Sequence, residues 1–417
     1  MRMPGSSGRG GAATLSAKYW ADPPARPTAK VIAVRPATST RHCCSSRCAT
    51  SARRINPPRT GYPGTSIALD SEASLCLEII LEAVANSTRA DKQAPQRPTQ
   101  PSTCEADRAL LSLASVLQRN GYHFSCITPD THARVAARRT DGARDLRDVF
   151  GWSLPFGEHD LPSEIVELLE ASEALSRENG RLRSLVRFAS FDETLLLHSA
   201  WPTTVNDSVF FGPDTYRFAS LIEQVLLKWP RGTPGVVVDV GCGTGAGGIL
   251  VGRLLKAHSL KVVFTDINEQ ALRFARINAL HAGTADFSCV RSDVLNQVRS
   301  PIDLIIANPP YLLDPQQRAY RHGGGPLGTG LSVRIVEESL QRLAPGGQLI
   351  LYTASPIVDG EDTLEQQLAT VFNAASQRSF SYEYREIDPD VFGSELEHAA
   401  YADVERIAVV GLVLRIA

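Results

Sequence analysis

Strand-like and helix-like runs alternate along the chain from Trp201 onward. Because strands that alternate with helices need right-handed crossover connections, this pattern predicts an α/β fold with a mainly parallel sheet and helices on both faces. The strand-like runs are GVVVDV, LKVVFTD, DFSCV, IDLIIAN, GQLILYT and ERIAVVGLVLRI. The helix-like runs are GGILVGRLLKAH, NEQALRFARINALHAG and LSVRIVEESLQRLA. In the second of these helices we expect Asn268 to be the N-cap and Gly283 to end the helix.

The chain upstream of this pattern divides into two regions by composition. Residues 1–103 are rich in Ser, Pro, Arg, Thr and Ala and lack periodicity apart from one helix-like run within residues 71–87. We therefore expect a disordered basic leader on a cytoplasmic protein, with an organelle transit peptide as the alternative. Residues 104–200 contain two helix-like runs and the strand-like runs RLRSLVRFAS and DETLLLHSA. They predict a small helical domain with one hairpin, either for substrate recognition or as a packing extension of the domain at residues 201–417.

Charge is distributed unevenly along the chain. The formal net charge is −2, but residues 1–60 hold eleven Lys and Arg and one acid, which leaves residues 61–417 with a net charge of −12. An acidic body binds long nucleic acid poorly by counterion release and favours a protein substrate, whereas the Arg-rich stretch at residues 134–147 favours phosphate contacts. The eight cysteines lack metal-ligand spacing, and no apolar run has the length of a spanning helix, so we expect neither a metal nor a membrane.

The loop after the first strand is rich in glycine. Ligands in open α/β sheets bind beyond the carboxyl ends of the strands, so the loops that follow the strands carry the candidate sites. In DVGCGTG three alternating glycines allow a turn and let backbone N–H groups approach a ligand closely. Alone, this loop indicates either a nucleotide-like cofactor or a tight turn. Its candidate cofactor-binding residues are Asp239, Gly241, Cys242, Gly243, Thr244 and Gly245.

Acidic residues follow the second and third strands. Asp266, with Ile267 beside it, lies 21 residues beyond Gly245, where a carboxylate can accept both hydroxyls of a ribose. After the third strand Asp293 can accept an adenine amino group while Val294 covers the ring, although a lone Asp at such a place also serves as a helix cap. NAD and S-adenosylmethionine each contain ribose and adenine, so both cofactors remain open at this point.

The fourth strand ends in Asn308, Pro309, Pro310 and Tyr311, a sequence that suits methylation of a planar nitrogen. The nitrogen of an amide or of an exocyclic aromatic amine is a poor nucleophile because its lone pair is delocalised. If the Asn308 side-chain oxygen and the Pro309 carbonyl each accept one N–H, the lone pair is directed at a sulfonium methyl group. The prolines fix these acceptors, and Tyr311 can stack on the planar group. Orientation and electrostatic complementarity would supply the acceleration without a metal.

These motifs resemble, in order and spacing, the class I S-adenosylmethionine-dependent methyltransferases that modify amino groups. The resemblance covers roughly residues 208–417. It implies a Rossmann-like sheet of seven strands with one antiparallel strand at Ile407–Ile416. It also implies that the glycine loop holds the methionine part of S-adenosylmethionine. The further contacts that it implies are Asp266 with the ribose, Asp293 and Val294 with the adenine, and Asn308 to Tyr311 with the target nitrogen.

A segment before the first strand narrows the resemblance. FFGPDTYRFASLIEQVL is similar to the PRPDTE segment of the protein-glutamine N5-methyltransferases that act on release factors. Gly212 stands where those enzymes carry Arg, and Tyr216 stands where they carry Glu. The candidate substrate or cofactor contacts here are Phe211, Pro213, Asp214 and Thr215. A glutamine amide of a protein, such as a translation factor, is therefore the first candidate target.

Other functions remain as alternatives. Methylation of guanine N2 or adenine N6 in rRNA or DNA is one, since such enzymes share the core or the NPPY motif. A nicotinamide-dependent dehydrogenase is a second, because Gly243, Gly245 and Gly248 nearly satisfy GxGxxG. A silent RNA- or protein-binding module that retains the fold is a third. The segment YRHGGGPLGTG, at residues 320–330, predicts either a mobile lid or a plain connection.

Overall fold

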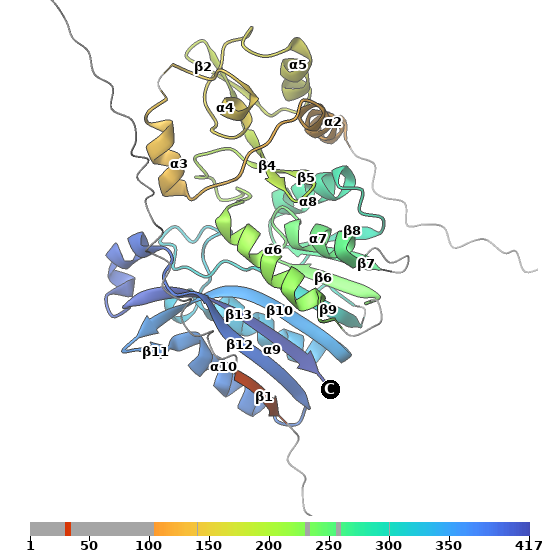
Figure 1. Cartoon of the computed structure of the whole chain (residues 1–417), viewed down its shortest axis with the longest axis vertical. Coiled ribbons are helices and arrows are strands. Elements are labelled where there is room, and N and C mark those ends of the chain that lie inside the picture. Colours follow the sequence, from red (N-terminus) through yellow and green to blue (C-terminus); the bar gives the residue numbers. More distant parts are fainter. Residues whose placement is uncertain (1–29, 35–103, 140, 230–233, 256–259, 300) are drawn as a thin grey trace, which may run out of the picture. The chain divides into compact units, whose positions relative to one another are not determined.

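The computed structural model describes residues 30–34, 104–139, 141–229, 234–255, 260–299 and 301–417, and all of them fall in one compact unit (Figure 1). The predicted leader lies outside the described residues except for Lys30–Val34, which forms strand β1 where we expected no regular structure. The helix expected within residues 71–87 also lies outside them.

The centre of the fold is a nine-stranded sheet with the order β1-β12-β13-β10-β9-β6-β7-β8, to which the short β11 adds beside β10. Its other strands are β6 (Val236–Val240), β7 (Lys261–Asp266), β8 (Phe287–Arg291), β9 (Ile302–Ala307), β10 (Leu343–Val358), β11 (Glu361–Asp362), β12 (Phe380–Asp388) and β13 (Arg406–Ile416). Strands β6 to β10 pair in parallel, whereas β13 is antiparallel to both of its neighbours, β10 and β12.

Strands β6 to β10, β12 and β13 form the seven-stranded sheet that the resemblance implied, and β13 is its antiparallel strand. Six of these strands lie where the sequence predicts them. The seventh, β12, was not predicted, because FSYEYREID alternates aromatic and charged residues without a continuous apolar run. β1 then extends the sheet by pairing antiparallel with β12.

Helices cover both faces of the sheet (Figure 1). The helices of the first face are α6 (Pro213–Leu226), α7 (Ala246–Leu255) and α8 (Glu269–His281), and those of the second are α9 (Gly330–Arg342) and α10 (Thr363–Ala374). Successive strand residues point to opposite faces. Val237 accordingly packs in the core beneath α6 to α8, whereas Val238 packs in the core beneath α9 and α10.

The limits predicted for α8 are confirmed. Asn268 caps the helix by accepting a hydrogen bond of 2.9 Å from the Gln270 N–H. Gly283 follows the helix with φ +70°, and the Thr284 N–H returns to the Ala279 carbonyl at 2.9 Å, which satisfies a terminal carbonyl of the helix. Because the N-cap Asn268 lies two residues after Asp266, the carboxylate of Asp266 is held just before the first turn of α8.

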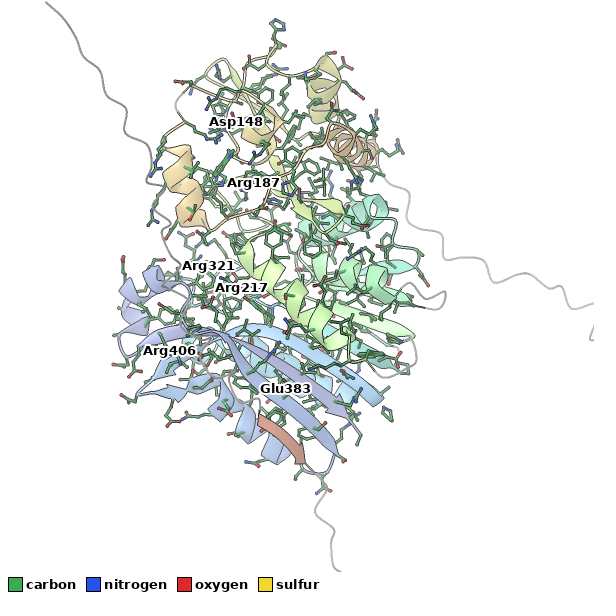
Figure 2. All side chains as sticks on the ribbon, viewed as in Figure 1. Asp148, Arg187, Arg217, Arg321, Glu383 and Arg406 are labelled. Atoms are coloured by element: carbon green, nitrogen blue, oxygen red, sulfur yellow. The ribbon has the colours of Figure 1, made fainter. Side chains whose placement is uncertain are left out.

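Residues 104–200, here called the accessory region, contain four helices and two hairpins. The helices are α2 (Glu105–Arg119), α3 (Pro129–Ala136), α4 (Leu146–Phe150) and α5 (Ser163–Ala171). The hairpins are β2–β3 (Leu175–Glu178 and Arg181–Ser184) and β4–β5 (Val186–Phe191 and Thr194–Ser199). Figure 2 shows Asp148 of α4 and the buried Arg187 of β4 within this region.

The predicted hairpin is present as β4–β5, and the structure adds a second hairpin, β2–β3, before it. RLRSLVRFAS is divided at Leu185, whose side chain is exposed and whose backbone N–H and carbonyl bond to Ala174 and Ala200. The strands on either side of Leu185 therefore pair with different partners. The helix-like run PSEIVELLEASEAL predicts a helix as far as Leu175, whereas α5 ends at Ala171 and Leu175 begins β2.

Within the part of the chain that the structure describes, every helix is too short or too polar to span a bilayer. The same residues contain no group of three or more His, Cys, Asp or Glu side chains placed to hold a metal ion.

Candidate active site

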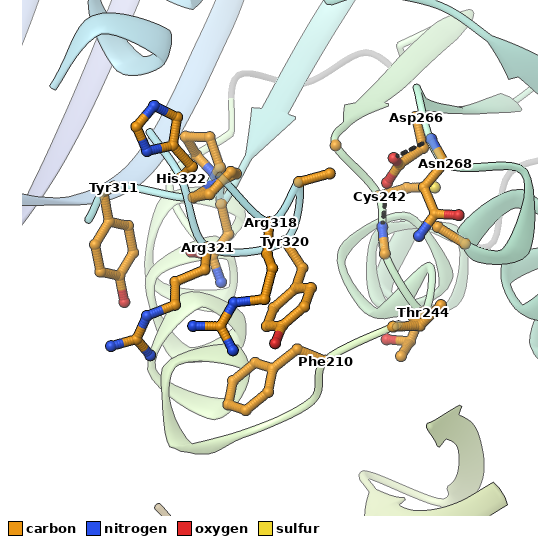
Figure 3. A pocket seen from close by; sticks show the side chains of 18 of the residues that line it. Phe210, Cys242, Thr244, Asp266, Asn268, Tyr311, Arg318, Tyr320, Arg321 and His322 are labelled. Atoms are coloured by element: carbon orange, nitrogen blue, oxygen red, sulfur yellow. Dashed lines mark hydrogen bonds between the residues drawn. The ribbon is translucent and has the colours of Figure 1, made fainter. Parts of the chain in front are cut away.

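A pocket of about 630 Å³ lies at the carboxyl ends of β6, β7, β8 and β9 (Figure 3). It collects most of the residues that the sequence singled out. Those that line it are Asp239, Gly241, Cys242, Gly243, Thr244, Asp266, Ile267, Asp293, Val294, Asn308, Pro309, Pro310, Tyr311, Asp214 and Thr215. Gly245, Phe211 and Pro213 are not part of the lining.

The glycine loop, residues 239–245, turns away from β6 through left-handed backbone at Gly241 (φ +63°) and Gly243 (φ +52°). The Gly243 N–H donates a hydrogen bond of 3.0 Å to Asp266 Oδ2. Gly245 has a different task, because a Cβ there would lie 3.1 to 3.3 Å from Phe264 and Ala275. Gly245 therefore permits close packing of α7 against the sheet and α8, and its contact with a cofactor stays a prediction.

The two acidic residues at the ends of β6 and β7 are held by backbone donors. Asp239 is 2% exposed, and its Oδ2 accepts a hydrogen bond of 2.8 Å from the Gly248 N–H. Asp266 Oδ1 accepts a hydrogen bond of 2.9 Å from the Asn268 N–H, and Figure 3 shows how Asp266 and Asn268 lie together at one side of the pocket. Burial raises the pKa of the Asp266 carboxyl in spite of these donors.

The NPPY loop, residues 308–311, faces the glycine loop across the pocket. Asn308 is half-buried, and the chain beyond the loop is fixed by three hydrogen bonds. They run from Leu312 N–H to Arg321 carbonyl (3.3 Å), from Gly323 N–H to Leu312 carbonyl (2.8 Å) and from Leu313 N–H to Tyr401 Oη (2.8 Å). The loop is thus held by segments that follow it in sequence by about ten and about ninety residues.

The glycine-rich segment, residues 323–330, packs directly on the NPPY loop. A Cβ on Gly323 would lie 2.7 Å from the Pro310 carbonyl oxygen and 2.8 Å from the Tyr311 Cα. A Cβ on Gly328 would lie 2.5 Å from the Tyr311 carbonyl oxygen. Because only glycine fits at these contacts, the segment packs against the backbone of the NPPY loop and supports it. The sequence predicted either a mobile lid or a plain connection here, and neither prediction included this support.

Tyr311 lines the pocket, but most of its side chain is buried. Its side chain is 7% exposed, and its ring centre lies 5.9 Å from that of Phe392. Burial, the nearby Asp214 carboxylate and a hydrogen bond to it raise the pKa of Tyr311 well above its usual range. Asp214 also accepts a hydrogen bond of 2.9 Å from Tyr352 Oη. It forms an ion pair with Arg217, which is labelled in Figure 2.

The segment that precedes α6 divides between the core and the pocket. The ring of Phe211 is 1% exposed and packs against those of Phe191, His198 and Tyr216. Its neighbour Phe210 lines the pocket instead. Consecutive residues of extended backbone point to opposite sides, so Phe210 lines the pocket and Phe211, which the sequence indicated as a candidate contact, packs in the core.

Tyr216, which departs from the related segment, anchors the accessory region. Its hydroxyl accepts a hydrogen bond of 3.1 Å from the Cys126 N–H and donates one of 3.0 Å to the Ser190 carbonyl. A glutamate at this position could accept the first bond but could not donate the second. Tyr216 therefore links α6 by hydrogen bonds to Cys126 and to Ser190 of the β4–β5 hairpin.

Comparison with known proteins agrees with the geometry. Residues 218–382, which include β6 to β10 and part of β12, match the family model of the methyltransferase small domain. This part of the chain is a class I S-adenosylmethionine-dependent methyltransferase domain.

Curated relatives of the methyltransferase domain carry two kinds of name. A release factor glutamine methyltransferase of Bradyrhizobium diazoefficiens is 35% identical over 141 residues, which are 31% of this chain and 45% of that protein. The protein of the same name in Mycobacterium leprae is 33% identical over 156 residues, or 33% of this chain and 53% of that protein. A ribosomal RNA small subunit methyltransferase C of Chromohalobacter salexigens is 33% identical over 115 residues, or 28% of this chain and 30% of that protein. The chain spans about half the length of the first of these relatives.

The acidic residues of the pocket of the methyltransferase domain suit the positive charge of S-adenosylmethionine. Burial raises the pKa of the Asp239 carboxyl to about 8, the Gly248 N–H lowers it in part, and the neighbouring Asp266 carboxylate raises it further. A positive charge bound beside Asp239 would stabilise its ionised form. The ammonium group of S-adenosylmethionine is such a charge. Ile267, which is 51% exposed at the pocket, offers an apolar surface for a flat ring.

Asp293 and Val294 meet the pocket differently. Asp293 is exposed and forms an ion pair of 2.5 Å with Arg334 of α9. Val294 is 5% exposed and lies in left-handed backbone with φ +51°. The carboxylate of Asp293 is therefore shared between α9 and the pocket of the methyltransferase domain, and its role toward adenine stays a prediction.

The structure adds pocket residues that sequence reasoning missed. They are Trp201, Phe210, Arg318, Tyr320 and Phe392, of which Phe210, Arg318 and Tyr320 are labelled in Figure 3. None of them belongs to a strand-end motif. Two features of the sequence could have indicated some of these pocket residues. Phe210 is adjacent to the candidate Phe211, and Tyr320 begins the segment YRHGGGPLGTG that follows NPPY.

Proposed function

We propose that this chain is an S-adenosylmethionine-dependent N-methyltransferase that acts on a planar nitrogen of a macromolecule. One observation carries the proposal: the NPPY loop lines the same pocket as Asp239 and Asp266, at the carboxyl ends of adjacent parallel strands. The pocket thus unites features suited to a nucleoside cofactor with acceptors suited to an NH₂ group.

On this proposal the cofactor is held by residues at the carboxyl ends of β6 and β7. S-adenosylmethionine supplies an electrophilic methyl group. Asp239 faces its ammonium group, the backbone of Gly241 and Gly243 approaches its methionine part, and Asp266 accepts from the ribose hydroxyls. Asp266 keeps this capacity because each of its oxygens receives one backbone N–H and has a second lone pair.

Asn308 and Pro309 then orient the target. The Asn308 Oδ1 and the Pro309 carbonyl each accept one N–H of the target, which turns the remaining lone pair toward the methyl group. The packing of Gly323 and Gly328 behind the loop fixes these acceptors in advance of binding. Water takes up the proton that the nitrogen loses, so the proposal assigns no base among the side chains.

A glutamine amide in a protein is the first candidate target. Relatives named release factor glutamine methyltransferase match the domain, and residues 61–417 carry a net charge of −12. An exocyclic base amine is the second candidate. It is favoured by the relative named ribosomal RNA small subunit methyltransferase C and by the exposed Arg134 and Arg138, which lie near the end of α3.

The proposal is tested with labelled cofactor and an extract from a strain that lacks the gene. Purified protein should transfer label to a component of the extract, and protease digestion should release that label from the precipitable fraction. Loss of the label to nuclease alone would replace the glutamine amide by a base amine. An absence of transfer to any fraction would overturn the proposed activity.

A further inference from the structure

Gly212 leaves room for an aromatic ring at the pocket. This residue caps α6, and a Cβ on it would lie 2.7 Å from Cζ and 2.8 Å from Cε1 of Phe210. Side-chain carbons do not approach one another so closely, so any larger residue at position 212 would force the Phe210 ring to move. The position of the Phe210 ring therefore depends on the absence of a side chain at Gly212.

Phe210 pairs with a second ring from a distant part of the sequence. The ring centres of Phe210 and Tyr320 are 6.4 Å apart, and their planes differ by only 15°. The Tyr320 hydroxyl donates a hydrogen bond of 2.7 Å to the Thr203 carbonyl, which fixes the orientation of its ring. Both rings are half-buried and line the pocket that contains Asn308.

Arg318 holds the Tyr320 ring from another side. Its guanidinium carbon lies 5.6 Å from the centre of that ring. The guanidinium is itself fixed by two hydrogen bonds to the buried Asp314, of 2.8 Å from Nε and 2.6 Å from Nη2. Tyr320 is therefore pre-oriented by neighbours on two sides, as Figure 3 shows for Arg318 and Phe210. A rigid aromatic surface costs little entropy when a ligand binds to it.

We propose that Phe210 and Tyr320 form the wall against which the planar, nitrogen-bearing group of the target lies, and that Gly212 sets target selection by keeping this wall in place. This inference rests on the proposed methyl transfer. Tyr311 offers less surface than these two rings, because its side chain is only 7% exposed and packs on Phe392, whereas Phe210 and Tyr320 are half-buried at the pocket. Since the Tyr320 hydroxyl is also engaged, the wall selects by flatness and apolar contact, and Asn308 and Pro309 supply the polar recognition.

The wall is tested by initial rates of label transfer to increasing concentrations of the extract described above. Phe210→Ala, Tyr320→Leu and Gly212→Arg should each raise the apparent KM for the extract about tenfold, which is the loss expected for one aromatic contact. Calorimetry should show that these variants bind S-adenosylhomocysteine like the wild type. Tyr382→Leu is the matched control. The ring centre of Tyr382, on β12, lies 4.3 Å from that of Phe372 on α10, and Tyr382 is not part of the pocket lining. It should keep the wild-type KM.

The outcomes separate the two inferences. Wild-type transfer together with an unchanged KM in Phe210→Ala and Tyr320→Leu would overturn the wall and leave the proposed function standing. An equal loss of S-adenosylhomocysteine binding in these variants would also overturn it, since the rings would then belong to the cofactor site. A wild-type protein that transfers no label would overturn the proposed function and the wall with it.

Discussion

Asn278 of α8 donates a hydrogen bond of 2.9 Å to the carbonyl oxygen of Thr244 in the glycine loop. The same amide also accepts 2.8 Å from the Leu197 N–H and donates 3.0 Å to the Leu197 carbonyl in β5 of the accessory region. A single side chain that is 1% exposed thus fastens the loop at the pocket to the hairpin beside it. The accessory region is connected to the cofactor side of the pocket by this contact.

Asn278→Leu should therefore weaken cofactor binding. Without the amide, backbone groups of Leu197 and Thr244 lose their partners in a buried place, which costs about 1–3 kcal/mol of stability, and the glycine loop loses a support. We expect the Kd for S-adenosylhomocysteine to rise about tenfold, measured by calorimetry well below the Tm of the variant.

Asp107→Asn is the control for this variant. Asp107 of α2 accepts a hydrogen bond of 2.6 Å from Arg273 Nε, so it also joins α8 to the accessory region, but it does not reach the glycine loop. This variant should lose stability and keep its affinity. Equal affinities in the wild type and Asn278→Leu would show that the loop needs no such support.

Asn308→Ala should reduce transfer about 100-fold or more, because one of the two acceptors that orient the target NH₂ is lost. Affinity for S-adenosylhomocysteine should stay measurable by calorimetry. The rate is to be followed with labelled cofactor and saturating extract. Retention of full activity would contradict the role given to the NPPY loop.

Cofactor affinity should rise with pH because of Asp239. The pKa of this carboxyl is about 8 in the free protein, so the group is protonated at neutral pH, whereas a bound ammonium group favours its ionised form. Binding below about pH 8 must then release a proton. Affinity should increase up to about tenfold per pH unit between about pH 6 and 8 and reach its maximum near pH 8, because the α-ammonium group of the cofactor itself loses its proton above that range.

Calorimetry in buffers of different ionisation enthalpy measures this proton release directly. Asp239→Asn cannot ionise, so it should bind more weakly at about pH 8 and show affinity that no longer depends on pH through this group. If the affinity of the wild type for the cofactor does not change with pH, and binding releases no proton across the same range, the ammonium group does not lie beside Asp239.

Gly323→Ala should impair transfer without loss of cofactor binding. The added methyl group would overlap the Gly328 carbonyl oxygen and lie 2.7 Å from the Pro310 carbonyl oxygen, so it would displace the glycine-rich segment together with the NPPY loop, at a cost of about 2–3 kcal/mol in stability. Gly324→Ala is the matched variant, because its Cβ would meet no atom within 4 Å. It carries only the strain of a residue with φ +65°, about 1 kcal/mol, and should transfer at nearly the wild-type rate. Comparable rates for both variants would mean that the loop needs no support from behind.

The sequence predicted the strand-end residues well, because each buried apolar run stops where its functional side chain begins. Asp239, Asp266 and Asn308 could be placed at one edge of a parallel sheet without any tertiary information. Their spacing and order also indicated the antiparallel strand, through the resemblance. These features depend on local pattern, which a sequence shows directly.

Other features depend on long-range contacts and could not be predicted. The strand break at Leu185 exists because its backbone bonds to Ala174 and Ala200, which lie in other segments. The contacts of Tyr311 with Phe392 and Asp214 join it to residues about eighty positions after it and about a hundred before it, and its stacking on the target stays a prediction. Alternation along the chain cannot say which partner a ring will find.

The position of β13 between β10 and β12 has a consequence for the synthesis of the chain. Strand β12 leaves the ribosome before β13, yet apart from its pairing with β1 it joins the large sheet only through β13. Until residues 406–416 emerge, the aromatic edge of β12 and one edge of β10 both lack this neighbour. The nascent chain therefore has to keep two sheet edges from pairing elsewhere while it waits for one strand, which makes this interval the period in which a chaperone would help it most.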